Sequence, residues 1–473
     1  MLNGRKKEPG PVFGQIVPSI SRTNRNVFEP SRFRNLCQTR AKGFTIEWRF
    51  KRKVKIDICY ERMMNSRRET AMKEHKEFLL HKILSRLGRR TMWMIPAYLW
   101  ILFISQLLKK VTGIQIRVVA IPSRFGHLAL EPDLYLARND GNSSKSKKIF
   151  AYYPVDASSE SLLEEWKKIF GRAPQSIIKC IYEVETSTGK RHFLEDLLEA
   201  SIPEEIQILD SAPRRVFNDF DWGSKDEFRA RLSSKSLENI ILLAVRDSTY
   251  EKMLNFHTGG EHALFRNSEI SNYLSGIKAL NAQGFTIVRM GKSGESLAEY
   301  SDTKYIDLCS LDVKSVDLLQ FYLADICKAV IATDTGAINF GMLFRKPIYC
   351  LNFASLSNGF RSNYLKLLMF KKMRDKTSGE LLTLEEMFRR GFQNFIHQDQ
   401  ILRSNVSLED NTEQEILEFS FEVREHLAGQ WKPTQDSINL KKKFTYFSER
   451  YGIPIPTVEF PNSWAGKSQH LLG

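Results

Sequence analysis

Residues 330–353 read VIATDTGAINFGMLFRKPIYCLNF, and this stretch decides the fold that the sequence predicts. An apolar strand is followed by a small polar turn and a helix, and Pro347 ends that helix before a second run of β-formers at 348–353. The first N–H groups of a helix have no partner inside it, so they attract anions, and a glycine lets a phosphate approach the backbone. The turn therefore predicts a phosphate loop made of Asp334, Thr335 and Gly336. The alternative is that this turn binds no phosphate and only caps the helix, with Gly336 as a residue that tolerates many backbone conformations.

Two more apolar runs of strand length lie upstream, at 239–245 and 285–288, with a helix-like segment between them at 268–283. Continuous apolar strands that alternate with helices predict parallel βαβ units, in which ligands bind beyond the carboxyl ends of the strands. The first run stops at Arg246, and the second stops at Arg289 with Lys292 close behind. Because Arg matches phosphate oxygens bidentately, this edge predicts a diphosphate clamp, although each Arg alone could be a solvated strand end.

Three blocks carry a resemblance to a known family: RDS at 246–248, FRNSEI at 265–270 and VRMGK at 288–292. The chain resembles bacterial glycosyltransferases that carry RDS, (F/Y)RNSDI and VRMGK blocks, with Glu269 standing where that family usually has Asp. The resemblance covers roughly 117–353. Besides the three blocks, it includes the segments 124–127, 131–133 and 333–336. It implies a fold of two Rossmann-like lobes (GT-B type) and a nucleotide-sugar donor. The predicted donor-binding residues are Arg246, Arg266, Arg289, Lys292, Asp334, Thr335 and Gly336.

A second strand-to-loop junction lies in the N-terminal half. The run at 114–121 predicts a strand, and the loop predicted at 122–127 ends in His127. A neutral His at such a strand end can take the proton from an acceptor hydroxyl. Asp133 and Asp247 are alternative bases, and His127 could instead orient a phosphate.

Metal and thiol chemistry find little support in the sequence. The DxD triplet Asp219-Phe220-Asp221 has no apolar strand leading into it, so we expect no metal role and no cofactor. The six Cys show no CxxC spacing, which favours reduced thiols in a cytoplasmic protein. His257 and His262 flank a Gly-Gly pair, which predicts either a lid or an ordinary surface connection.

The positive charge is concentrated at the start of the chain. The first 110 residues hold 25 Lys and Arg against 8 Asp and Glu, although the whole chain carries a net charge of only +15. The same region contains the longest apolar run, 91–108, with basic residues on both sides. If this helix crossed the membrane, the lobes that follow it would lie outside the cytoplasm, away from the cytoplasmic nucleotide sugars. We therefore predict an interfacial helix on an anionic membrane surface, with a buried core helix as the alternative.

These observations combine into an α/β fold of two Rossmann-like lobes preceded by a basic membrane-associating helical region. The predicted segments are an arm at 1–80, the membrane helix at 81–112, an acceptor lobe at 113–232, a nucleotide-sugar lobe at 233–400 and C-terminal helices at 401–473. Helical spacing is predicted at 364–370, 384–392 and 413–428.

The predicted function is a metal-independent glycosyltransferase, peripheral on the cytoplasmic face of the membrane. It would transfer sugar from a nucleotide-sugar donor to a cell-surface glycan or lipid-linked acceptor. A sugar-nucleotide epimerase of the same fold is one alternative. A non-catalytic, basic nucleic-acid-binding or membrane-binding protein is the other, although the arm lacks the interleaved aromatic residues expected for nucleic acid.

Overall fold

The computed structural model describes most residues between 89 and 473, all within one compact unit, Ile83–Gly473. The described ranges are 89–139, 147–218, 232, 237–247, 264–291, 297, 300–310, 313–356, 362–395, 397–455 and 457–473. The basic arm predicted at 1–80 lies outside them, as do the predicted residues Asp219, Asp221, His257, His262 and Lys292.

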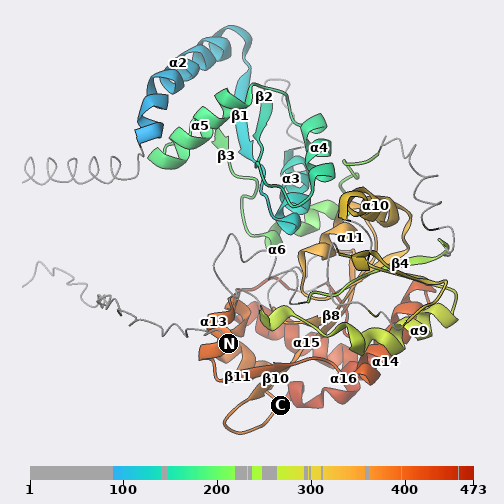
Figure 1. Ribbon diagram of the computed structural model, residues 1–473. Helices are drawn as coiled ribbons and strands as arrows, with labels where there is room; N and C mark the ends of the chain where they lie inside the picture. Colours follow the sequence, from blue (N-terminus) through green and yellow to red (C-terminus); the bar gives the residue numbers. More distant parts are fainter. Residues whose placement is uncertain are drawn as a thin grey trace, which may run out of the picture. The chain divides into compact units, whose positions relative to one another are not determined.

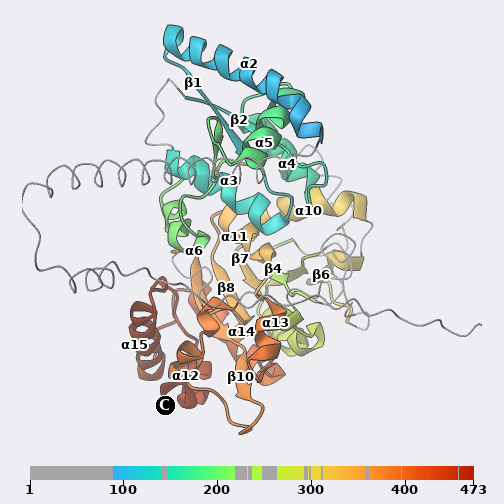
Figure 2. The ribbon, with the colours of Figure 1, turned by 90° about the vertical axis from the view of Figure 1, so that its left-hand side faces the viewer.

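A small parallel sheet forms first along the chain (Figure 1). Its strand order is β2-β1-β3, with bounds β1 (Gln115–Ala120), β2 (Lys147–Tyr152) and β3 (Leu194–Glu195). The long helix α2 (Arg89–Thr112) precedes this sheet and lies alongside α5 (Figure 2). The other helical elements of this part are α3 (Phe125–Asn139), α4 (Glu160–Ile169), α5 (Gln175–Thr188), α6 (Ile202–Glu205) and η3 (Ile206–Asp210).

A six-stranded, all-parallel sheet follows, in the order β6-β5-β4-β7-β8-β9. Counted along the chain within this sheet, the order is 3-2-1-4-5-6, which is the order of Rossmann sheets. The strands are β4 (Ile240–Ala244), β5 (Thr286–Arg289), β6 (Tyr305–Asp307), β7 (Ala329–Ala332), β8 (Ile348–Phe353) and β9 (Leu365–Phe370). The helical elements between them are η4 (Leu264–Arg266), η5 (Ile270–Tyr273), α9 (Leu274–Ala282), η6 (Leu308–Ser310), α10 (Val313–Ile326), η7 (Gly336–Ile338) and α11 (Asn339–Leu343).

The central strands are buried on both faces, which explains their continuous apolar sequences. Every residue of β4, β7 and β8 is buried, as expected for parallel strands covered by helices on both sides. One hydrophobic cluster includes side chains near the first sheet, such as Leu128 and Trp166, together with Leu242 and Val330 of the second. The two sheets therefore share a continuous core.

The C-terminal part packs on the larger sheet. Its strands β10 (Lys372–Asp375) and β11 (Val406–Glu409) pair antiparallel. Helix α14 (Glu413–Leu427) packs against α9, and a capping box between Thr412 and Glu415 fixes its start. The helical elements are α12 (Leu384–Arg389), η8 (Phe392–Asn394), α13 (Gln398–Arg403), α14 (Glu413–Leu427), α15 (Gln435–Arg450), α16 (Asn462–Lys467) and η9 (Gln469–Leu472).

Most of the predicted elements are confirmed, and two predictions are wrong. The strands predicted at 239–245, 285–288, 348–353 and 114–121 all form. The helix predicted at 364–370 is instead strand β9, because this short apolar run pairs with β8 and completes the sheet. The loop predicted at 122–127 is also shorter than expected, since α3 already begins at Phe125.

Candidate functional site

The candidate site lies where β4 and β7 end side by side. These two strands pair in parallel, and the chain connections leave them in opposite directions across the sheet. Such a switch in direction opens a crevice beyond the carboxyl ends of the strands, where ligands of open α/β sheets bind. Arg246 follows β4 at this point, and Thr333 to Gly336 follow β7.

Arg246 is tied to both neighbouring segments. Its backbone N–H donates to Thr333 Oγ1 at 3.0 Å, which joins the ends of β4 and β7. Its Nε donates to Asn267 Oδ1 at 3.2 Å, and the side chain is half-buried. The structure therefore places this predicted clamp residue at the switch point.

Arg266 lies at the same edge, and its guanidinium is incompletely satisfied. Its buried Nε has no hydrogen-bond acceptor among the described residues, and Asp334 Oδ2 lies 3.7 Å from it. The side chain keeps 21% of its surface exposed. A buried donor without an acceptor is costly, so this position favours an anion that completes the hydrogen bonding.

Asp334 holds the edge together through its own hydrogen bonds. The carboxylate is buried and accepts from the backbone N–H of Ser355 at 3.2 Å and from its hydroxyl at 3.0 Å. These bonds connect the segments after β7 and β8. Asp334 therefore joins two segments at this edge, and its part in donor binding stays a prediction.

Arg289 is enclosed in the protein interior. Only 1% of its side chain is exposed, with Nη1 at 3.3 Å from Asp307 Oδ2 and Nη2 at 3.2 Å from Asp247 Oδ2. The guanidinium therefore joins the ends of β4, β5 and β6 from inside the protein. In the structure, Arg289 and Asp247 are buried partners of one another, and their roles in donor binding and proton transfer stay predictions.

Cys309 lies beside this ion triad, and its backbone N–H donates to Asp307 Oδ1 at 3.0 Å. Burial raises the pKa of Cys309 to about 12, which disfavours the thiolate form at neutral pH.

Helix α3 brings the predicted base to the same region. Gly126 and Gly336 touch through their backbones: a Cβ built on Gly336 would lie 3.0 Å from Gly126 Cα. Asn339 Nδ2 donates to Gly126 O at 2.8 Å, and the rings of Phe125 and Phe340 lie 4.7 Å apart. The start of α3 is thus fixed against the segment after β7, so Gly336 serves a backbone contact.

His127 follows directly in the first turn of α3, and its side chain is half exposed. Its Nδ1 lies 2.5 Å from Glu131 Oε1, one turn further along the helix. A carboxylate on one ring nitrogen fixes the orientation of a His and leaves the other nitrogen for proton transfer. Glu131 was not among the predicted site residues, although its i,i+4 spacing from His127 is a sequence signal for this pair.

Asp133, the other predicted base, is enclosed on the inner side of α3. It is 1% exposed, and Arg345 Nη1 lies 2.8 Å from its Oδ2 while Arg215 Nη1 lies 3.3 Å from its Oδ1. Two guanidinium groups hold this carboxylate, and Arg345 comes from the segment after α11. In the structure Asp133 joins α3 to the segment after α11, and its role as a base stays a prediction.

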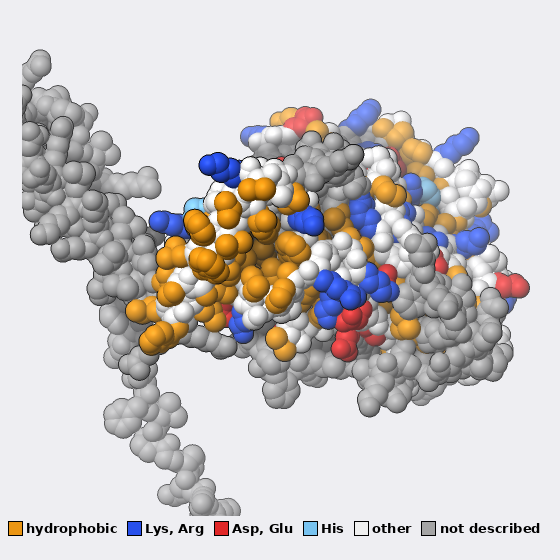
Figure 3. All heavy atoms as spheres, turned by 90° about the horizontal axis from the view of Figure 1, so that it is seen from above, with side chains coloured by type: hydrophobic (Ala, Val, Ile, Leu, Met, Phe, Trp, Pro, Cys, Tyr) orange, Lys and Arg blue, Asp and Glu red, His pale blue; other side chains and the backbone are white. Residues whose placement is uncertain are grey.

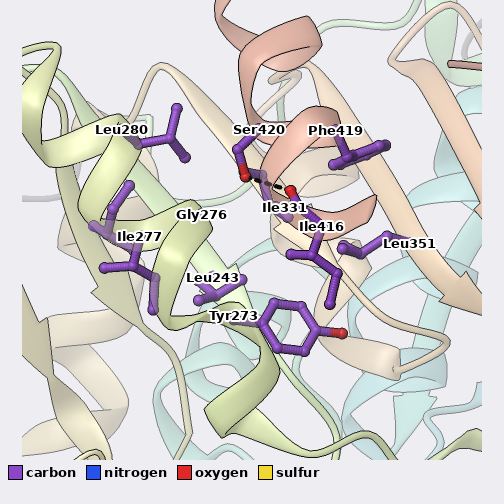
Figure 4. Close-up of a pocket in the computed structure, with 11 residues that line it drawn as sticks. Leu243, Tyr273, Gly276, Ile277, Leu280, Ile331, Leu351, Ile416, Phe419 and Ser420 are labelled. Carbon is purple, nitrogen blue, oxygen red and sulfur yellow. Dashed lines mark hydrogen bonds between the residues drawn. The ribbon is translucent and has the colours of Figure 1, made fainter. Parts of the chain in front are cut away.

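No metal cluster accompanies these residues in the described part of the chain. No group of three His, Cys, Asp or Glu side chains is arranged to hold a metal ion within that part. A small cavity of about 20 Å³ lies between α9 and α14 (Figure 4). Its lining is almost entirely apolar, and a Cβ on Gly276 would lie 2.5 Å from Ser420 Oγ. This space is a gap in helix packing.

No family model matches this chain, and no curated protein matches it either. Among solved structures, the chain is similar to ADP-heptose lipopolysaccharide heptosyltransferase II of E. coli, with 16% identity over 67% of this chain and 99% of that one, at a TM-score of 0.37. It is also similar to a family 9 glycosyl transferase from Veillonella parvula, with 11% identity over 66% of this chain and 97% of that one, at a TM-score of 0.39. Scores this low leave the family and the activity of this chain unassigned.

Proposed function

We propose that this protein is a glycosyltransferase that binds a nucleotide-sugar donor at the ends of β4 and β7. The observation that supports this most directly is the switch point of the six-stranded sheet, flanked by Arg246 and the under-satisfied Arg266. Two guanidinium groups at such a crevice suit the diphosphate of a nucleotide sugar. The acceptor is a cell-surface glycan or a lipid-linked glycan.

The transfer step follows from the placement of α3. His127, oriented by Glu131, takes the proton from an acceptor hydroxyl, and the hydroxyl oxygen attacks the anomeric carbon of the donor sugar. The bond between the anomeric carbon and the diphosphate breaks, and the nucleoside diphosphate leaves with the electron pair. Arg246 and Arg266 balance the charge that develops on it. A single displacement of this kind inverts the anomeric carbon.

Metal independence is part of the proposal. Two fixed guanidinium groups supply the positive charge that a divalent cation supplies in metal-dependent transferases. The reaction is therefore expected to proceed in EDTA. Because nucleotide sugars are cytoplasmic, the protein is expected on the cytoplasmic face of a membrane.

A thermal-shift screen of the full chain tests the donor site. UDP-, GDP-, ADP- and CMP-sugars are compared with and without EDTA, since a ligand that binds the folded state raises the melting temperature. We expect one nucleotide class to raise it in EDTA, with the shift lost in Arg246→Ala and Arg266→Ala. Arg450→Ala, at an exposed position on α15, is the matched control and should keep the shift. No shift with any of the four classes would contradict the proposal.

The epimerase alternative is separated by incubating the protein with its donor alone. An epimerase converts the sugar without an acceptor, whereas a transferase leaves the sugar unchanged until a glycan or lipid-linked acceptor is added. The alternative of a non-catalytic nucleic-acid-binding protein predicts salt-dependent DNA binding that does not respond to nucleotide sugars. Product analysis by NMR and a filter-binding assay distinguish these outcomes.

A further inference from the structure

Helix α2 is apolar on two opposite faces, and only one of them is covered. The covered face packs on the first sheet and on α5, through Tyr98 and its neighbours Met94, Ile101 and Leu102. Within α2, a 22-residue segment, Thr91–Thr112, is long and apolar enough to cross a membrane by length and composition. Only 17% of its apolar window is buried in the protein, so the second face is left to the surroundings.

The uncovered face forms a continuous stripe. Trp93, Trp100 and Phe103 are 86%, 65% and 59% exposed, and Leu107 and Val111 continue the row toward the end of the helix. Their spacing of three, four or seven residues places them on one side of an α-helix. Figure 3 shows apolar side chains gathered over this part of the molecule. Contiguous exposed apolar surface of this kind marks an interaction site.

The covered face is fixed to the rest of the protein by a buried hydrogen bond. Tyr98 Oη donates to Glu185 Oε1 at 2.7 Å, and the same carboxylate accepts from the backbone N–H groups of His192, Phe193 and Leu194. A helix that crossed a bilayer would have to leave this carboxylate and its apolar neighbours behind. The attachment therefore holds α2 along the protein, with the Trp93–Phe103 side turned outward.

The charges around this stripe identify the partner. The helix contains no Asp or Glu, begins at Arg89 and Arg90, and carries the exposed residues Lys109 and Lys110 in its last turn. Basic residues at both ends of an apolar stripe with two Trp match the boundary between anionic headgroups and acyl chains. If the α2 helices of two protein copies packed against each other, acidic groups would be needed opposite these lysines. Helix α2 contains no acidic residue that could provide them.

We propose that α2 lies in the plane of an anionic membrane surface, with Trp93, Trp100 and Phe103 inserted at the boundary between headgroups and acyl chains. The helix attaches the protein to one leaflet without crossing it. Sugar transfer plays no part in this argument, so the membrane contact and the proposed donor site can fail separately.

Flotation of the full chain with lipid vesicles tests the proposal. Vesicles of phosphatidylcholine alone are compared with vesicles that also contain phosphatidylglycerol, at low and high salt. Trp100→Glu and, separately, Trp93→Glu are expected to lower vesicle binding roughly tenfold or more, because each places a charge in the apolar stripe. Leu402→Glu and Tyr446→Glu are matched controls, since these residues are 62% and 55% exposed on other helices and should leave binding unchanged.

Further measurements separate a loss of membrane binding from a loss of folding. Melting temperatures of the Trp variants should equal that of the wild type, because their side chains are exposed in the folded protein. Brominated lipids should quench Trp fluorescence of the wild type more than that of Trp100→Phe.

Three results would overturn the proposal. Trp93→Glu and Trp100→Glu could float as well as the wild type. The bound protein could resist extraction by alkaline carbonate, which indicates a spanning helix. Light scattering could show a lipid-free dimer that Trp100→Glu dissociates, which identifies a second copy as the partner.

Discussion

Gly126 of α3 and Gly336, at the start of the segment after β7, meet backbone to backbone. Each is the nearest neighbour of a Cβ placed on the other, at 3.1 and 3.0 Å. This contact brings the predicted base and the predicted donor-binding segment to one place, because His127 follows Gly126 directly.

The first prediction concerns this contact. Gly336→Ala places a methyl group against the backbone of Gly126, which cannot move without shifting α3, so we expect a loss of about 1–3 kcal/mol in the free energy of unfolding. Urea denaturation measures it. Gly466→Ala is the matched control, since the nearest atom to its new Cβ is 3.7 Å away and stability should not fall. Equal stability of both variants would contradict the close approach.

Arg289 provides the second prediction. Arg289→Met removes the guanidinium that Asp247 and Asp307 share in the interior, and we expect a loss of about 3–5 kcal/mol of unfolding free energy. Arg374→Ala breaks a half-exposed pair with Glu409 and should lower stability far less, because solvent screens that pair. Chemical denaturation without ligand measures both. A small effect of Arg289→Met would contradict the buried ion triad.

The third prediction separates His127 from Glu131. His127→Ala should lower kcat roughly 10²–10⁴-fold, as the loss of a general base does, with little change in donor binding. Glu131→Gln should have a smaller effect and should shift the pH profile of kcat, because Glu131 acts through the imidazole. Donor titrations run in parallel with the rate measurements. If both variants kept the wild-type rate and pH profile, the base would have to be another group.

Tyr98 supports a fourth prediction about the attachment of α2. Tyr98→Phe keeps the ring but removes the hydrogen bond that Tyr98 donates to the buried Glu185 carboxylate. We therefore expect a loss of about 1–3 kcal/mol in the free energy of unfolding. Thermal unfolding and hydrogen exchange of α2 amides report it. Tyr446→Phe, at an exposed ring on α15, is the control and should be neutral. Unchanged exchange of α2 in Tyr98→Phe would show that this bond does not hold the helix.

His426 makes stability depend on pH. Burial lowers the pKa of His426 below its ordinary value of 6.5, and Tyr349 Oη lies 3.0 Å from its Nδ1. The neutral ring is therefore favoured in the folded protein. Its contribution to stability is complete above pH 6.5 and is lost as pH falls toward the folded pKa. Denaturation at pH 7.5 and 5.5 should show a smaller pH dependence in His426→Gln than in the wild type, and identical pH dependence would contradict this assignment.

The strands of the larger sheet could be predicted because strands that are buried on both faces have continuously apolar sequences. The runs at 239–245 and 348–353 are continuously apolar and correspond to β4 and β8. The run at 364–370 could not be assigned in the same way, because six apolar residues fit a short helix equally well. Pairing with β8, a non-local event, decides its structure.

The candidate site was predicted in part for a similar reason. Arg246 could be placed at a strand end from local sequence alone. The enclosure of Asp133 could not, because its partner Arg345 lies 212 residues away in the chain. The contact between Asp247 and Arg289 could not be predicted either, because the sequence around each residue does not show that the two side chains meet in the interior.

Calorimetric titration of nucleoside diphosphates in EDTA tests the central claim, that Arg246 and Arg266 form an anion site at the ends of β4 and β7. The account predicts binding of one nucleoside diphosphate to the wild type and to Arg450→Ala, and a loss of roughly tenfold or more in affinity in Arg266→Ala, since a charge-assisted hydrogen bond is removed. Unchanged affinity in Arg266→Ala and Arg246→Ala would place the ligand elsewhere and contradict the account.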